Sequence, residues 1–213
     1  MDSIDRKKHW ESIYHTKDTQ QVSWFQPTPE MSLDFIKELN IPLTAKIIDV
    51  GGGDSLLVDH LLQLGYKDVT VLDISEKSLK NAKMRLGPQA KQVTWIVADI
   101  TEFVSVTHYD LWHDRAAFHF LTNAQEIESY VLTVKNSLAP DGIMVIGTFS
   151  DKGPTECSGL EIAQYSEESM TALFTENFSK IKCLLTDHQT PSGDQQNFIF
   201  CCFKKLSKVR QQV

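Results

Sequence analysis

The sequence predicts an α/β fold with a doubly wound, mostly parallel sheet and an antiparallel hairpin at its C-terminal edge. Apolar runs at 46–50, 68–73 and 92–97 alternate with segments of helical periodicity. Such alternation is typical of parallel sheets with right-handed crossovers. Two later runs, at 180–187 and 196–203, are separated by turn residues, so we expect them to pair as the hairpin.

Periodicity, caps and chain breakers define the other elements in order. Helices are expected at 5–15, 30–39, 55–64, 76–86, 124–137 and 167–176. Further strands are expected at 109–113 and 143–149. Ser75 is placed to cap the helix at 76–86, and Gly87-Pro88 is placed to end it. A short helix or turn is expected at 101–104, and the turn 139–142 leads into the strand that follows it.

An aspartate stands at or next to the end of each of the first three strands. These residues are Asp49, Asp73 and Asp99. Ligands of open α/β sheets bind outside the carboxyl ends of the strands, so the three carboxylates are expected to surround one nucleoside-containing ligand. The alternative is structural, because aspartates at such positions also cap helices.

Length and charge restrict the kinds of partner. The 213 residues suit one domain, 1–213, with residues 1–40 as an N-terminal helical cap or lid. The net charge of -7 argues against nucleic-acid binding, which needs clustered Lys and Arg. The dense basic patch lies in the tail, at Lys204, Lys205, Lys208 and Arg210, and is expected to be solvated. No apolar run approaches the ~18 residues of a membrane span.

The cysteines and the polar N-terminus favour a cytoplasmic protein. Cys157, Cys183, Cys201 and Cys202 show no CxxC spacing, so we predict neither a metal site nor a redox pair. No apolar signal core follows the first residues. The thiols are therefore expected to stay reduced.

The glycine run after the first strand helps to decide which class of cofactor the chain binds. A dinucleotide fingerprint requires a third glycine where this chain has Leu56. Asp54 stands where a pyrophosphate would need backbone amides at a helix N-terminus, and it would repel that group. A nicotinamide-dependent oxidoreductase therefore stays a second hypothesis.

Asp49-Val50-Gly51-Gly52-Gly53-Asp54-Ser55 resembles motif I of the class I S-adenosylmethionine-dependent methyltransferases, and the likeness extends from about Lys46 to Phe149. The resemblance implies a Rossmann-like, seven-strand sheet and S-adenosylmethionine as the cofactor, with S-adenosylhomocysteine as the product. It also implies that Gly51, Gly53 and Ser55 pass close to the methionine portion.

The same resemblance assigns cofactor contacts strand by strand. Asp49 would lie near the amino group of the methionine portion. Asp73 would hold the ribose hydroxyls, with Ile74 beside it, and a carboxylate that accepts two hydrogen bonds suits adjacent hydroxyls. Asp99 and Ile100 would face the adenine.

Two N-terminal segments, 9–14 and 23–26, resemble the cofactor lid of bacterial small methyltransferases of this superfamily. Trp10, Tyr14 and Trp24 are therefore expected at the cofactor, where aromatic faces attract a sulfonium. Packing of the cap onto the sheet is the competing interpretation, and both can hold.

The end of the fourth strand, within 109–121, lies beside the transferable methyl group in the family that this segment resembles. His113, Asp114 and His119 are the candidates for a general base. A structural histidine and an Asp114–Arg115 ion pair are the alternatives. The loop 153–160 is expected to help wall the acceptor site.

These observations predict transfer of a methyl group from S-adenosylmethionine to a small molecule or a protein side chain by in-line displacement. A cofactor-binding regulatory module without activity is the third hypothesis. The sequence indicates neither the acceptor nor the oligomeric state.

Overall fold

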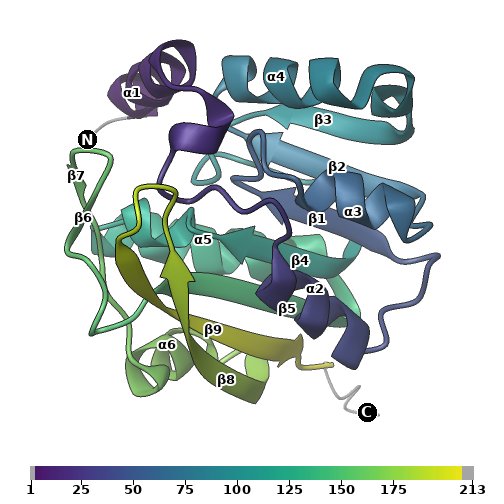
Figure 1. Ribbon diagram of the computed structural model, residues 1–213. Coiled ribbons are helices and arrows are strands. Elements are labelled where there is room, and N and C mark those ends of the chain that lie inside the picture. The colour runs from purple at the N-terminus through teal and green to yellow at the C-terminus, as the bar shows by residue number, and fades with distance from the viewer. Residues whose placement is uncertain (1–2, 208–213) are drawn as a thin grey trace, which may run out of the picture.

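The computed structural model describes residues 3–207, so Lys208 and Arg210 of the basic tail lie outside the described residues. The main strands are β1 (Lys46–Val50), β2 (Asp68–Asp73), β3 (Val93–Val97), β4 (Tyr109–Arg115), β5 (Leu138–Phe149), β8 (Phe178–Gln189) and β9 (Gln195–Lys205). They form one seven-stranded sheet in the order β3-β2-β1-β4-β5-β9-β8 (Figure 1). Pairs from β3 to β5 are parallel, and β9 is antiparallel to both β5 and β8. The predicted fold class is confirmed.

The helices are α1 (Ser3–Thr16), α2 (Glu30–Glu38), α3 (Leu57–Gln63), α4 (Glu76–Leu86), α5 (Ala124–Ser137) and α6 (Glu167–Phe174). Their ends follow the expected cap chemistry. The Ser75 side chain accepts a hydrogen bond from the Ser78 amide at the start of α4, and Asn123 does the same for Glu126 at the start of α5. Within the described residues, no helix combines the length and the apolar character needed to cross a membrane.

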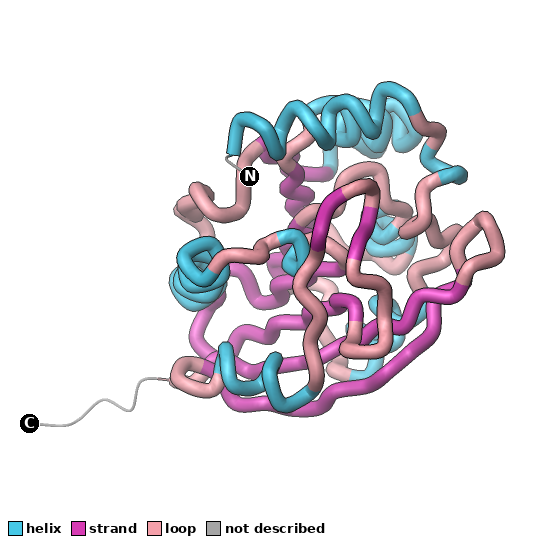
Figure 2. Tube along the Cα trace, turned by 90° about the vertical axis from the view of Figure 1, so that its left-hand side faces the viewer, coloured by secondary structure: helices cyan, strands magenta, loops and turns pink. Residues whose placement is uncertain are grey.

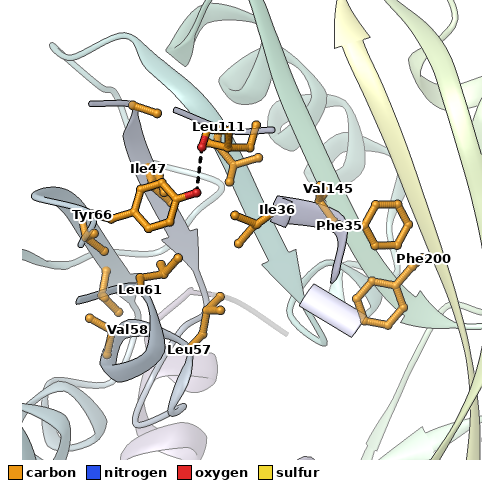
Figure 3. Close-up of a cluster of buried hydrophobic side chains, with 14 of the residues drawn as sticks. Phe35, Ile36, Ile47, Leu57, Val58, Leu61, Tyr66, Leu111, Val145 and Phe200 are labelled. Atoms are coloured by element: carbon orange, nitrogen blue, oxygen red, sulfur yellow. Dashed lines mark hydrogen bonds between the residues drawn. The ribbon is translucent and has the colours of Figure 1, made fainter. Parts of the chain in front are cut away.

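Two apolar layers cover the two faces of the sheet. On one face α2 and α3 pack against β1, β4 and β5, as the side chains of Ile36, Leu57 and Leu111 show in Figure 3. On the other face α5 packs against β4 and β5, where Tyr130 contacts Trp112, and α6 packs against β8 and β9 through Phe174. Side chains alternate along a strand, so β4 sends residues 111, 113 and 115 to the α2 side and residues 112 and 114 to the α5 side. This alternation decides which β4 residues can reach the site.

The N-terminal part of the chain divides into two structures rather than one cap. Helix α2 contributes Phe35 and Ile36 to the main core and is an integral layer of the fold. Helix α1 lies beside α4, near the β3 edge, while the β8–β9 hairpin forms the opposite edge, in Figure 1 and in the turned view of Figure 2. The Glu11 carboxylate accepts a hydrogen bond from the Glu76 amide at 2.6 Å and so ties α1 to the start of α4.

The structure differs from the sequence expectations in several local features. Of the helix or turn expected at 101–104 the structure has the turn, whereas β5 begins already at Leu138, with Asp141 at a positive φ. A short hairpin of β6 (Glu156–Cys157) and β7 (Leu160–Glu161) occupies the loop after β5. Cys183 and Cys201 form a disulfide, which corrects the expectation that all thiols stay reduced. The two cysteines are register partners on β8 and β9, a proximity that local spacing cannot reveal.

Candidate functional site

A cavity lies at the carboxyl ends of β1 to β5, under α1 and the segment 23–24. It contains about 820 Å³ of space between atoms, part of it open to solvent. The predicted residues that line it are Trp10, Tyr14, Trp24, Gly51, Asp73, Ile74, Asp99 and Ile100. Those that do not line it are Asp49, Gly53, Ser55, His113, Asp114 and His119. The structure therefore brings together the residues that follow β2 and β3 with the aromatic residues of the N-terminal segments.

Asp73 ends β2 with its carboxyl group facing the cavity. Its Oδ1 accepts a hydrogen bond from the Ser75 amide at 2.8 Å, which fixes the plane of the group. A Cβ placed on Gly53 would lie 3.2 Å from Oδ2, so this oxygen is on the side of the glycine loop. Burial raises the pKa of Asp73 to about 7, because removing a carboxylate from water disfavours its charged form. The Asp73 carboxyl group, which can accept two hydrogen bonds when ionised, is thus held in a buried position at the cavity.

Asp99 lines the same cavity, but both of its oxygens already have partners. Thr101 donates to Oδ1 from its amide at 2.9 Å and from its hydroxyl at 2.7 Å. Arg6 of α1 donates to Oδ2 at 3.0 Å and also pairs with Glu126 at the start of α5. Asp99 therefore accepts hydrogen bonds from the turn that follows it, as in the structural alternative, and it also lies on the cavity wall. No sequence pattern distinguishes Arg6, which is one of several basic residues in a polar helix.

The glycine loop is compact because other parts of the chain approach it closely. Gly51 has φ +63°, and a Cβ there would meet the Cβ of Ala117 at 2.4 Å. Gly53 has φ +50°, and a Cβ there would meet the Tyr14 hydroxyl at 2.6 Å. Only glycine fits such a combination of positive φ and close contact. Tyr14 covers Gly53, which explains why Gly53 does not face the cavity.

Asp49 and His113 form an interior pair rather than a ligand contact. The His113 Nδ1 and the Asp49 Oδ1 are 2.7 Å apart, and the His113 Nε2 is 2.8 Å from the Ser32 hydroxyl of α2. Both side chains are buried, and His113 has no ring nitrogen left for a substrate. Neither side chain lines the cavity, and the roles expected for Asp49 at the cofactor and for His113 at the reacting group stay predictions. The pair joins β1, β4 and α2.

Asp114 and His119 are also placed inside the protein. Asp114 points to the α5 side, where it accepts hydrogen bonds from the Tyr130 hydroxyl at 2.7 Å and from the amides of Ala117 and Phe118. Burial raises its pKa to about 6. The anticipated Asp114–Arg115 ion pair does not form, since the two side chains leave opposite faces of β4. Neither Asp114 nor His119 lines the cavity, and their expected catalytic roles stay predictions.

His119 is stacked on Phe149, with ring centroids 4.5 Å apart, and its Nδ1 accepts a hydrogen bond from the Phe149 amide. Burial lowers its pKa to about 3, with a smaller effect of the Arg115 charge. His119 is thus a neutral side chain beneath the wall of the cavity, and it is not poised to accept a proton at neutral pH.

The far end of the cavity is made by residues that sequence reasoning did not assign. These residues are Arg115 at the end of β4, Ala116 directly after it, Phe149 at the end of β5, Phe198 on β9 and Cys157 on β6. The 153–160 loop was expected near this place, and Cys157 puts it on the cavity wall. The sequence signal for Arg115 was present at the end of β4, but it was interpreted as half of an ion pair.

Comparison with known proteins agrees with this geometry. Residues 47–142 match a family described as "Methyltransferase domain". The crystal structure of the N-methyltransferase NodS from Bradyrhizobium japonicum WM9, in complex with S-adenosyl-l-homocysteine, superposes with a TM-score of 0.69 at 16% identity, covering 94% of this chain and 99% of that chain. Residues 47–142 are thus similar to a methyltransferase domain, and the fold is that of the class I methyltransferases. S-adenosylmethionine is the donor that this likeness supports, and the oxidoreductase alternative is not favoured.

Two curated relatives match this chain over shorter stretches. Nodulation protein S of Rhizobium fredii is 28% identical over 85 residues, which make up 40% of this chain and 48% of that protein. The eEF1A lysine and N-terminal methyltransferase of Mus musculus is 26% identical over 121 residues, which make up 56% of this chain and 17% of that protein. The chain thus spans less than half of either relative's length, and the likeness to the solved structure concerns the fold alone.

Proposed function

We propose that this methyltransferase binds S-adenosylmethionine in the cavity and transfers its methyl group to an acceptor that enters beside the ends of β4 and β5. The observation that carries the proposal is that Asp73, Asp99 and Gly51, from three neighbouring strand ends, line one cavity. When bound, the cofactor supplies a methyl group on a sulfonium sulfur, and transfer breaks that C–S bond with the electron pair left on sulfur.

The chain's own residues suit the donor. The Asp73 Oδ2 is available to accept hydrogen bonds from ribose hydroxyls, while Oδ1 is held by the Ser75 amide. Asp99 and Ile100 border the space beyond it, where a flat base fits. Trp10 and Trp24, whose rings are 5.8 Å apart in an edge-to-face arrangement, form an aromatic cover that favours a cation and excludes water. In this proposal α1 acts as the lid, and Arg6 fastens it to Asp99.

The cavity offers no evident general base for the acceptor. Among the described residues that line it, the carboxylates are Asp73 and Asp99, both on the donor side, and no histidine is present. Burial also raises the pKa of the Cys157 thiol, which keeps it protonated near neutral pH. We therefore propose catalysis by alignment and exclusion of water, with an acceptor atom that already carries a free lone pair.

A label-transfer assay tests the activity. The full chain is incubated with methyl-tritiated S-adenosylmethionine and a cell extract, and the products are separated by size. We expect tritium in a small-molecule or a protein fraction, and much less of it with Asp73→Asn. Binding of S-adenosylhomocysteine without any transfer of label would instead favour the regulatory module and contradict catalysis.

A cytoplasmic location stays part of the proposal. The Cys183–Cys201 disulfide is the feature that opposes it, because disulfides persist mainly in oxidising compartments. Cell fractionation tests the location: recovery in the cytosolic fraction is the expected result, and recovery from an extracytoplasmic fraction contradicts it. Alkylation of the denatured protein tests the disulfide, and we expect it to label Cys157 and Cys202 alone.

A further inference from the structure

Arg115 is a half-buried cation at the acceptor end of the cavity, and its guanidinium has an incomplete set of partners. As the last residue of β4, it reaches toward β9, where its guanidinium carbon is 5.4 Å from the centre of the Phe198 ring. Its Nη1 donates a hydrogen bond to the Trp24 carbonyl at 2.9 Å. Its Nη2 is shielded from solvent and has no hydrogen-bond acceptor within the described part of the chain.

The charge of Arg115 also lacks a counterion. Among residues 3–207, no carboxylate forms a salt bridge with it. Asp49 is the acid that acts on it electrostatically, but the Asp49 Oδ1 is engaged by His113. Burial lowers the pKa of Arg115 to about 10, which still leaves it charged at neutral pH. Buried charges in proteins are normally paired, so this one indicates a missing anion.

The surroundings of Arg115 define what such an anion would be attached to. Phe120, Phe149 and Phe198 line the cavity near it and provide apolar and aromatic walls. The neighbouring His119 has a buried Nε2 without a partner in the described residues, and since its Nδ1 accepts a hydrogen bond, this Nε2 carries the proton. The acceptor end therefore contains unpaired donors and no free acid, the reverse of the donor end.

We propose that Arg115 determines acceptor specificity by binding a carboxylate, or a similar oxyanion, of an acceptor whose aromatic or apolar body lies against Phe120, Phe149 and Phe198. This inference rests on the proposed methyl transfer. The fork of a guanidinium fits a carboxylate with two parallel hydrogen bonds, and the unpaired Nη2 supplies one of them. The carboxylate of the cofactor's own methionine portion has the same chemistry and is the rival occupant.

The experiment uses benzoate as the probe and benzamide as its neutral counterpart. Each is titrated by NMR into the full chain saturated with S-adenosylhomocysteine. Because hydrogen bonds to charged groups are strong, we expect benzoate to bind at least about tenfold more tightly than benzamide. We expect Arg115→Gln to remove that preference and Arg115→Lys to retain part of it. Equal binding of the two probes by the unaltered protein, or binding of neither, overturns the proposal without relying on any variant.

A second arm separates the two sources of the anion. Calorimetry compares S-adenosylhomocysteine with its decarboxylated analogue, in the unaltered protein and in Arg115→Gln. If the acceptor supplies the anion, Arg115→Gln changes the affinity for both compounds little. A loss of about tenfold or more that is confined to the compound with the carboxylate assigns Arg115 to the cofactor and overturns the proposal. Failure of the unaltered protein to bind S-adenosylhomocysteine at all would refute the proposed function instead.

Discussion

The two halves of the cavity are built in opposite ways. The donor half, at the ends of β2 and β3, presents Asp73 and Asp99, each directly after its own strand. The acceptor half, at the ends of β4, β5 and β9, is made by Arg115, Phe149 and Phe198, which come from distant parts of the sequence. One half is acidic and locally encoded, and the other is basic, aromatic and assembled only by the fold. Under the proposed function, this difference corresponds to a donor pocket at the ends of β2 and β3 and an acceptor pocket at the ends of β4, β5 and β9.

The largest expected effect concerns His113, which belongs to the β4 interior and not to either half. His113→Ala leaves the buried Asp49 without its partner, so we expect a loss of about 3–5 kcal/mol in the free energy of unfolding. Urea denaturation measures this loss. His108→Ala, at an exposed position just before the same strand, is the matched control and should change little. If the variant kept its stability but lost most of its turnover, His113 would have a catalytic role, and its assignment to the protein interior, outside both halves of the cavity, would be contradicted.

The contrast between the two halves of the cavity also shows how much of the fold and of the site could be predicted from the sequence. The mostly parallel sheet with its C-terminal hairpin was predicted from alternating apolar runs and helical segments, and the positions of Asp73 and Asp99 from runs that end in acids. Asp49 shows why the same rule fails once: it ends a strand too, but His113 of the neighbouring strand occupies it. That contact depends on the spatial order of β1 and β4, which the chain does not state locally. Arg6, Phe198 and Cys157 reach the cavity through long-range packing, and no local pattern marks them.

The next largest effect concerns the donor half of the cavity and tests the role of Asp73. Asp73→Asn removes the charge that strengthens the expected hydrogen bonds to ribose, so the affinity for S-adenosylhomocysteine should fall by about 1.5–3 kcal/mol. Calorimetry measures the change. Asp68→Asn alters the exposed acid at the opposite end of the same strand and serves as the control, with no expected effect. Equal affinities in a folded Asp73→Asn protein would remove this residue from the cofactor site.

The smallest effect is a pH dependence of donor binding. The pKa of Asp73 is about 7 in the free protein, and ribose hydroxyls donate to the ionised carboxylate. The proton must leave before binding, so affinity for S-adenosylhomocysteine should rise by about tenfold between pH 6 and pH 8 and then level off. The Asp73→Asn protein should show a flat profile over the same range. A fall in affinity with rising pH, or an equal slope in the variant, would assign the titration to another group.

Calorimetric titration of the unaltered chain with S-adenosylhomocysteine, and separately with NAD, tests most directly whether the acidic half of the cavity holds an adenosyl sulfur cofactor. The proposed function predicts saturable binding of S-adenosylhomocysteine at one site per chain and no binding of NAD. Binding of NAD, or heat from neither compound, would contradict it.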